Sequence, residues 1–406
     1  TRPRIADNGA PWQPSPYREE VGRRLDVTAQ RLTSQHRPSP DAAASWPELL
    51  RTLSAHSALA SVDRQRDDAA WDWAAEGRPD LCGAIERGAS IIRQRTRPAG
   101  EGDPAAVAGP HDGDLTAWAE TFGHALGPGR TWSASRLEAY QACPFRFFIG
   151  SLLGLEPRER PAEGLDARQL GNIYHHIFER LYRTVGPEPA LEDLQAALPA
   201  VANDVLDAAP QREQFRATAW WEQTRRAIEQ HVARSLEALE SRPDEFAFHR
   251  AEATFGIPGQ PGPPLVVRDG EDAFQLRGYI DRVDRSSDGR VRIIDYKTAG
   301  PYGYHERALQ DGEKLQLPLY AMAAERALRL GSVSDGFYWH VRHAAASDLT
   351  LSGFGPRQAM EAAVAHAWRA VRGARGGRFV PEVPQHGCPS YCPAAAFCWH
   401  FEPDRW

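Results

Sequence analysis

Two acids, a histidine and a lysine stand out in this 406-residue chain, because their spacing could place them around one metal ion. Carboxylate oxygens suit Mg²⁺ or Mn²⁺, ions that commonly share their coordination with a substrate phosphate. A lysine beside such an ion can orient or deprotonate a water molecule, so the set predicts metal-dependent phosphodiester hydrolysis. The residues belong to four short motifs: Gly171-x3-His175, Gly278-Tyr-Ile-Asp281, Asp295-Tyr296-Lys297 and Gln316-x3-Tyr320.

Two of these motifs flank a predicted β-hairpin. Residues 273–285 and 290–298 alternate with period two and are rich in β-branched and aromatic residues, with a Ser-Ser-Asp-Gly segment between them. A three-residue loop ending at Gly289 places Asp281 directly opposite Asp295, with Cβ atoms about 5 Å apart. A two-residue loop would shift the register by one residue and put the acids on opposite faces. We favour the first register, because a bound cation turns the repulsion between the acids into coordination.

The same alternation sets the neighbours of the second acid. Period two puts Asp295 and Lys297 on one face of the strand and turns the Tyr296 side chain away. The alternative is that the acids are ordinary strand carboxylates paired with a basic residue such as Arg282, Arg292 or Lys297. The complete set at these spacings favours the metal site.

The candidate histidine lies in a predicted helix. Apolar residues recur with helical spacing over residues 170–182, which indicates one buried face. His175 borders that face, whereas His176 falls well away from it. Gly171, one turn before His175, leaves room for a strand or a substrate to approach the imidazole. We therefore expect His175 to be the ligand and His176 to be a surface residue.

Four of the five cysteines form a second group of candidate ligands. Cys388, Cys392 and Cys398 follow the pattern Cys-x3-Cys-x5-Cys, and Cys143 stands alone far upstream in a Tyr-x2-Cys-Pro-Phe motif. Four thiolates with one remote member can hold a [4Fe–4S] cluster or a zinc ion. The spacing leaves both open, with disulfides or simple burial as lesser alternatives. Cys82 lies outside the pattern, and we expect an ordinary buried thiol.

Together the motifs resemble the RecB-like branch of the PD-(D/E)XK nucleases, found in bacterial AddAB- and RecBCD-type helicase–nucleases. The resemblance covers residues 131–406. In that family the histidine and both acids bind metal, the lysine serves the attacking water, and the Gln-x3-Tyr helix helps to position DNA. The resemblance implies metal ligation by His175, Asp281, Asp295 and the Tyr296 carbonyl, and catalytic roles for Asp281, Asp295, Lys297, Gln316 and Tyr320.

The cysteine pattern extends this resemblance to AddB-type nuclease domains. In those domains an iron–sulfur staple pins the two ends of the domain together. The resemblance therefore implies a structural [4Fe–4S] cluster held by Cys143, Cys388, Cys392 and Cys398.

Two further acids lie near the motifs. Glu252, in the strand-like stretch 246–257, is a candidate for an extra acid, although its motif is loose. Asp284 completes an Asp-Arg-x-Asp pattern, but period-two geometry gives no reason to place it on the metal.

Composition agrees with a globular DNA-processing protein. At 42% hydrophobic residues the chain can bury one large core or two medium ones. No apolar run approaches the roughly 20 residues of a membrane span, and no signal peptide is visible. The cysteines indicate metal ligands in a reducing cytoplasm. Because the net charge is −6, DNA must be held by local positive charge, such as Arg225-Arg226 or the Arg369–Arg378 stretch.

The order of predicted elements indicates an α/β fold with a restriction-endonuclease-like mixed sheet flanked by helices. Residues 1–130 form a helical N-terminal region with a Gly/Pro/Asp-rich linker at Gly100–Asp114, and could be the tail of a helicase-like part of a longer polypeptide. Residues 131–406 form the nuclease domain. We expect helices at 134–149, 166–184, 190–208, 212–241, 313–330 and 356–373, and strands at 246–257, 273–285, 290–297 and 335–342, with a loop at Gly256–Asp272.

The expected function is that of a Mg²⁺- or Mn²⁺-dependent deoxyribonuclease. The resemblance implies an exonuclease that acts on single-stranded DNA ends delivered by a helicase subunit or helicase domain, in DNA repair or defence. The alternative is a non-catalytic nucleic-acid-binding scaffold. The intact set of two acids, lysine and histidine favours the enzyme. No Gly-x4-Gly-Lys-Ser/Thr loop is present, so we expect no ATP hydrolysis by this chain.

Overall fold

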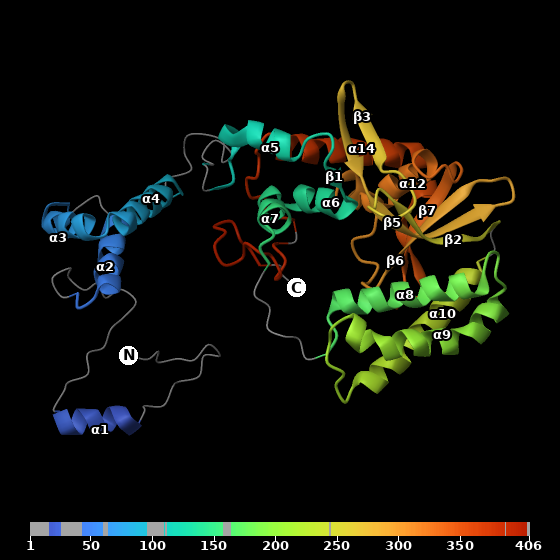
Figure 1. Cartoon of the computed structure of the whole chain (residues 1–406), viewed down its shortest axis with the longest axis horizontal. Coiled ribbons are helices and arrows are strands. Elements are labelled where there is room, and N and C mark those ends of the chain that lie inside the picture. The colour runs from blue at the N-terminus through green and yellow to red at the C-terminus, as the bar shows by residue number, and fades with distance from the viewer. Residues whose placement is uncertain are drawn as a thin grey trace. The chain divides into compact units, whose positions relative to one another are not determined.

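The chain divides into two compact units, Thr1–Val107 and Ala108–Trp406 (Figure 1). The opening Pro-rich segment and most of the predicted linker Gly100–Asp114 lie outside the residues that the structure describes. No helix within the described residues is long and apolar enough to cross a membrane. The computed structural model describes residues 16–25, 43–59, 64–95, 109, 112–156, 164–242, 245–385 and 387–403.

The described part of the first unit is helical. A small apolar cluster forms around Leu53 and Ala74, and Trp46 stacks on Trp73 with 4.8 Å between ring centroids. Cys82 is buried in this cluster, as predicted for an ordinary buried thiol, and burial raises the pKa of its thiol. The helices are α1 (Pro16–Leu25), α2 (Trp46–Leu59), α3 (Arg64–Gly77) and α4 (Pro79–Arg95).

A five-stranded mixed sheet forms the centre of the second unit. Its order is β2-β5-β6-β7-β8, with β6 and β7 parallel and the other neighbouring pairs antiparallel. This mixed sheet between helices confirms the predicted fold class. The strands are β2 (Phe246–Phe255), β5 (Gly278–Ser286), β6 (Val291–Lys297), β7 (Val333–His340) and β8 (Ala345–Thr350).

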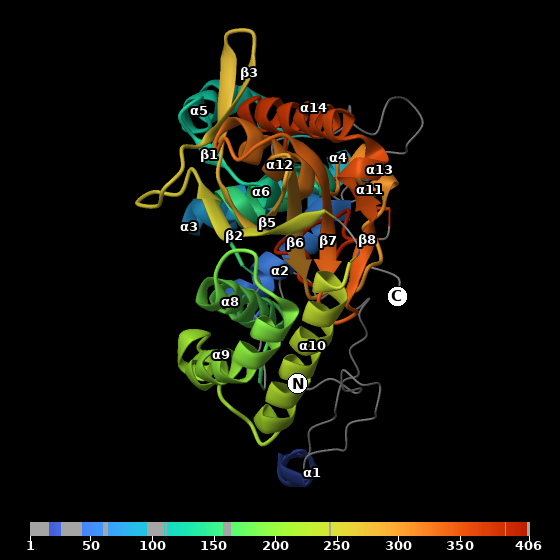
Figure 2. The same ribbon diagram turned by 90° about the vertical axis from the view of Figure 1, so that its right-hand side faces the viewer.

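Two helical layers cover the sheet (Figure 2). One layer contains α8 (Ala167–Val185), α9 (Leu191–Arg212) and α10 (Trp221–Glu240), which share an apolar core with one face. The other layer contains α12 (Gln316–Arg326) and α14 (Pro356–Arg375), whose apolar residues belong to the second core cluster. Each sheet face is therefore buried, and the polar groups between the layers must find partners inside the protein.

Local sequence explains the two elements that carry most of the candidate residues. Helix α8 begins with a capping box, in which Asp166 and Gln169 each bind the other's backbone N–H. The β5–β6 hairpin has the three-residue loop predicted from the sequence, with Gly289 at φ +86° and the Ser286 backbone N–H donating to the Arg290 carbonyl. The start of α8 and the turn between β5 and β6 are thus each determined by residues within a few positions of them.

A second, three-stranded sheet lies beside the first and corrects two expectations. Residues 273–285 are not one strand, because Arg277 leaves the ladder and its backbone N–H donates to the Trp132 carbonyl at 2.9 Å. The predicted Gly256–Asp272 loop contains a strand, because only its first part is dense in Gly and Pro and the rest pairs as a hairpin. The order is β1 (Thr131–Trp132), β4 (Asp272–Leu276) and β3 (Leu265–Asp269).

The helix predicted at 134–149 is broken in the structure. Cys143 is extended, with φ −166°, because the following Pro144 disfavours helical backbone before it. The segment becomes α6 (Ala134–Ala142), α7 (Pro144–Phe147) and a π-helical turn at Phe148–Leu152. The shorter helices α5 (Ala119–Ala125), α11 (Glu306–Gln310) and α13 (Leu351–Phe354) complete this unit's described α-helices.

Candidate active site

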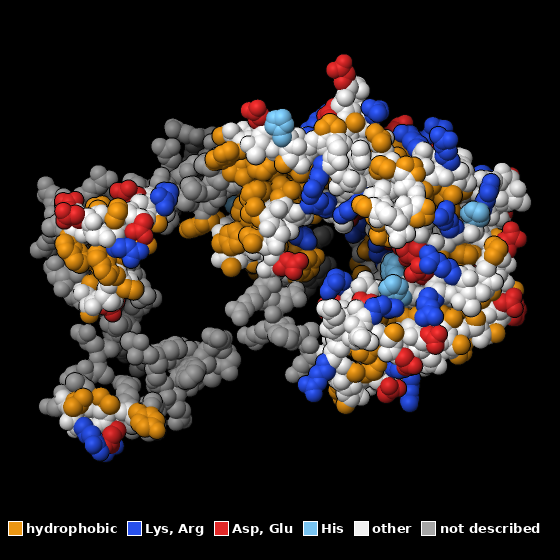
Figure 3. Space-filling view, in the orientation of Figure 1, with side chains coloured by type: hydrophobic (Ala, Val, Ile, Leu, Met, Phe, Trp, Pro, Cys, Tyr) orange, Lys and Arg blue, Asp and Glu red, His pale blue; other side chains and the backbone are white. Residues whose placement is uncertain are grey.

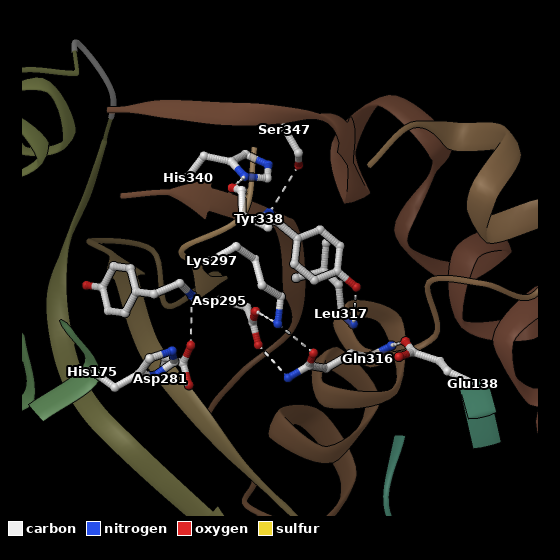
Figure 4. A network of polar contacts seen from close by, with 12 residues as sticks. Glu138, His175, Asp281, Asp295, Lys297, Gln316, Leu317, Tyr338, His340 and Ser347 are labelled. Atoms are coloured by element: carbon white, nitrogen blue, oxygen red, sulfur yellow. Dashed lines mark hydrogen bonds and ion pairs between the residues drawn. The ribbon is translucent and has the colours of Figure 1, made fainter. Parts of the chain in front are cut away.

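The predicted residues converge between β5, β6, α8 and α12 (Figure 4). Asp281 comes from β5, Asp295 and Lys297 from β6, His175 from α8 and Gln316 from α12. The structure therefore brings together residues that are up to about 140 positions apart in the sequence.

The hairpin holds its two acids close to each other. Val283 pairs with Ile293 in the predicted register, and the ladder ends with Arg282 opposite Ile294, one residue before Asp281 would pair with Asp295. In its place, the Asp281 carboxylate accepts the Tyr296 backbone N–H at 2.7 Å. Asp295 is 1% exposed, and burial, together with the charge of Asp281, raises its pKa to about 6. Adding a second negative charge here is unfavourable unless a cation balances it.

Lys297 and Gln316 enclose the other side of Asp295. The Lys297 ammonium lies 2.5 Å from Asp295 Oδ2 and donates to Gln316 Oε1 at 2.9 Å. Gln316 Nε2 in turn donates to Asp295 Oδ1 at 2.6 Å. Burial disfavours the ammonium charge, but Asp295 and Asp281 hold the pKa of Lys297 above its ordinary value. Lys297 is therefore a fixed cation beside the acids.

A candidate metal centre lies on the α8 side. The ligand atoms of His175, Glu252 and Asp281 all lie within 4.8 Å of one another. His175 Nδ1 is 3.4 Å from Asp281 Oδ1 and 3.9 Å from Glu252 Oε1. Burial lowers the pKa of His175, but these two carboxylates raise it well above its ordinary value. One imidazole and several carboxylates are a donor set that fits Mg²⁺ or Mn²⁺.

Glu252, whose sequence motif was loose, reaches this centre through an irregular backbone. Its φ is +47°, a left-handed value that is rare within a strand for residues other than glycine. The register of β2 against β5 also shifts between Phe248 and Arg250. Such strained backbone concentrates at functional sites, where the surrounding structure maintains it.

The neighbouring candidates separate as the sequence suggested. His176 points to Glu179, 3.4 Å away, and its side chain is 40% exposed. Asp284 lies outside the site and is fully buried between Arg282, at 2.5 Å, and Arg292, at 2.7 Å. The Asp-Arg-x-Asp pattern therefore contributes one acid to the site and one to a buried ion-pair network.

Tyr320 lies beneath the site. Its ring packs edge-on against Phe255 with 5.5 Å between ring centroids. A Cβ atom on Gly278 would lie 2.8 Å from the Tyr320 hydroxyl, so only glycine allows this approach. Tyr320 is 8% exposed, and any effect on a substrate would be exerted through its neighbours.

Several arginines suggested for DNA binding are paired with acids of the same chain. Arg225 lies 2.6 Å from an Asp207 oxygen, and Arg372 lies 2.5 Å from an Asp269 oxygen. These pairs leave less positive charge for a phosphate than the sequence suggested.

A different arginine group was missed from the sequence. Burial lowers the pKa of Arg136, on α6, and the nearby charges of Arg130 and Arg277 lower it further. Lys and Arg side chains gather around the hollow that separates α6 from α8 (Figure 3). These arginines come from separate elements, so no run of basic residues marked them.

The cysteines come from two ends of the second unit that pack together. Cys143, Cys392 and Cys398 belong to one small apolar cluster, and Phe145 of this cluster contacts the exposed Phe397 edge-on. All are free thiols, and Cys388 pairs through its backbone with the last described residues. Burial raises the pKa of the Cys398 thiol, and the other three cysteines raise it further. Within the described residues, the cysteine sulfurs are not gathered as closely as the ligand atoms around His175.

The sequence of the chain is similar to those of known nucleases. Residues 131–399 match the sequence model of the PD-(D/E)XK nuclease superfamily. Relatives named as a subunit of an ATP-dependent helicase/deoxyribonuclease include that of Moorella thermoacetica, which is 34% identical over 205 residues, covering 47% of this chain and 17% of the relative. The Leuconostoc citreum protein is 29% identical over 239 residues, covering 55% and 20%. The chain thus matches a fifth or less of the length of these relatives.

Proposed function

Because the chain belongs to the PD-(D/E)XK nuclease superfamily, we propose that it hydrolyses DNA phosphodiester bonds with a divalent cation held by His175, Asp281 and Asp295. Membership confirms the family resemblance predicted from the motifs. The observation that carries the proposal is the convergence of His175, Glu252 and Asp281 beside the buried Asp295–Lys297 pair. We further propose that Glu252 and the Tyr296 carbonyl complete the ligand set.

The side chains around the cation divide the remaining tasks. A bound divalent cation supplies Lewis acidity at the phosphate and lowers the pKa of a nearby water molecule. Lys297 has three N–H donors, of which two point to Asp295 and Gln316. The third can hold the attacking water or a phosphate oxygen. Gln316 fixes the ammonium in place, and Tyr320 supports the strand at Gly278 from below.

We propose single-stranded DNA ends as the substrate, delivered by a helicase subunit or domain. The names of the relatives combine a helicase with a deoxyribonuclease, which supports this partner. Arg130, Arg136 and Arg277 lie close enough to act on one another's charge and offer positive charge to a phosphate backbone.

We also propose that Cys143, Cys388, Cys392 and Cys398 hold a [4Fe–4S] cluster with a structural role. Their free thiols and their position at the junction of two remote segments support a cross-link there. A reducing cytoplasm would keep the thiols available. Iron and acid-labile sulfide in anaerobically purified protein would support the cluster, whereas one equivalent of zinc in colourless protein would contradict it.

The test of the nuclease is cleavage of end-labelled single-stranded and double-stranded DNA with Mg²⁺ or Mn²⁺. We expect degradation from the ends of single strands, loss of activity in His175→Ala and retention in the matched control His176→Ala. Inactivity of the wild type with both metals, or equal activity of both histidine variants, would instead favour a non-catalytic scaffold.

A further inference from the structure

Helix α12 begins with a carboxylate supplied by a remote helix. Glu138, on α6, accepts the backbone N–H of Leu315 at 2.7 Å and that of Gln316 at 3.0 Å, both through Oε1. These contacts join residues 177 and 178 positions apart. Figure 4 shows the carboxylate directed at the start of α12.

The local sequence does not provide this cap. The first N–H groups of a helix have no acceptor within the helix, and Leu315 at the N-cap has no side-chain oxygen. Pro318 has no N–H, and the Leu317 N–H donates to the Tyr338 hydroxyl at 3.2 Å. Glu138 therefore satisfies the amides that remain, and its negative charge lies at the positive end of the helix dipole.

The capped residue is also the one whose side chain links the candidate catalytic pair. Gln316 is the first residue of α12, and its amide spans Asp295 and Lys297 with contacts of 2.6 and 2.9 Å. A displacement of its backbone by about 1 Å would break both contacts, and misplacements of this size can reduce catalysis about a hundredfold.

We propose that Glu138 is a positioning residue: it fixes the first turn of α12 and so holds the Gln316 amide between Asp295 and Lys297. The proposal rests on the proposed nuclease function. Because α6 ends one residue before Cys143, the same contact couples the cysteine-bearing segment to the candidate active site. Disturbance of that segment then lowers the cleavage rate without removing any residue of the site.

Four variants test this assignment in the full chain: Glu138→Ala, Glu138→Gln, Gln316→Ala and the double variant Glu138→Ala/Gln316→Ala. Glu313→Ala is the control, because Glu313 is an exposed acid close to α12 in sequence. We expect Glu138→Ala to lower kcat about 10- to 100-fold while KM stays within about twofold. Glu138→Gln should restore most of the rate, because its amide oxygen can still accept. The double variant should be no slower than Gln316→Ala, as expected for residues that act through one contact.

Hydrogen exchange gives a readout that does not depend on cleavage. The amides of Leu315 and Gln316 should exchange at least about tenfold faster in Glu138→Ala and unchanged in Glu313→Ala. Additive losses of rate, an effect on KM alone, or unaltered exchange at both amides would overturn the assignment. If the wild type does not cleave DNA, the proposed nuclease function fails, while faster exchange in Glu138→Ala would still support the positioning contact.

Discussion

Asp281 and Asp284 lie three residues apart on β5 and are both buried, yet their surroundings differ in charge balance. Asp284 is held between Arg282 and Arg292, and Arg282 also pairs with Glu240 at 2.5 Å. Two carboxylates therefore meet two guanidiniums. Asp281 instead shares its surroundings with Glu252 and Asp295, and among the described residues a lysine and a histidine are the cations that oppose them. The first cluster is complete without a ligand, and the second has a surplus of negative charge that a cation can balance.

This difference separates structural from functional burial. Both buried clusters on β5 can shift the pKa values of their members, but only the cluster with surplus negative charge is stabilised by binding a cation. The balanced cluster joins β5 to α8 through Tyr182 and to α10 through Glu240, and α8 also carries His175. We therefore expect changes in the balanced cluster to affect folding and changes in the unbalanced cluster to affect catalysis.

The largest expected effect is the loss of cleavage in Asp295→Ala. Removal of this carboxylate should reduce kcat by roughly a thousandfold or more, as for other residues that act as one catalytic unit. The free energy of unfolding should be unchanged or higher in the metal-free protein, because a repelled buried charge is gone. Activity assays and urea titration of the same preparation measure both, and a folded variant with full activity would contradict the assignment.

The opposite result is expected for Asp284→Ala. Two guanidiniums would lose a buried partner, which should lower the free energy of unfolding by about 3–5 kcal/mol. Asp207→Ala breaks the surface pair with Arg225 and should cost less than about 1 kcal/mol. Urea unfolding compares the two. Equal stability of both variants would mean that the buried network around Asp284 does not stabilise the fold more than a surface ion pair does.

Divalent cations should stabilise the folded protein by binding at the cluster around Asp281, and not at the cluster around Asp284. At a Mn²⁺ concentration about a hundred times its Kd, the free energy of unfolding should rise by about 2.7 kcal/mol. Asp281→Asn should abolish this gain, which thermal unfolding with and without chelator can measure. A gain of the same size in the variant would place the cation elsewhere.

The smallest expected effect is a pH dependence of the metal-free protein. Burial raises the pKa of Asp295 from its ordinary value of 3.8 to about 6, so the native state binds this proton more tightly than the unfolded state. Its contribution to stability should therefore fall as the pH rises from about 4 to 6. With chelator present, Asp295→Asn should remove this slope between pH 4 and 6. An identical slope in the variant would assign the effect to another group.

Local rules predicted the parts of the site that local geometry determines. The period of a strand and the Gly289 turn gave the correct hairpin register, and helical phase separated His175 from His176. The fold class also followed from the order of elements.

Other features depend on contacts that local sequence does not contain. Alternation continues through Arg277, where the chain passes from one sheet to another, so nothing marked the break. Likewise, no sequence pattern predicts the left-handed backbone at Glu252 in the metal centre. Glu138 looks like any helical acid, because its role exists only once α6 has packed against α12.

The packing of α6 against α14 has a consequence for biosynthesis. Tyr140 on α6 donates its hydroxyl to the Arg378 carbonyl, a contact between residues 238 positions apart. At about 5–20 residues per second, translation of that interval takes on the order of tens of seconds. During that delay α6 lacks the surface that holds it, and the Glu138 cap on α12 has no fixed support. The candidate active site would therefore be completed only after the residues around Arg378 have been synthesised.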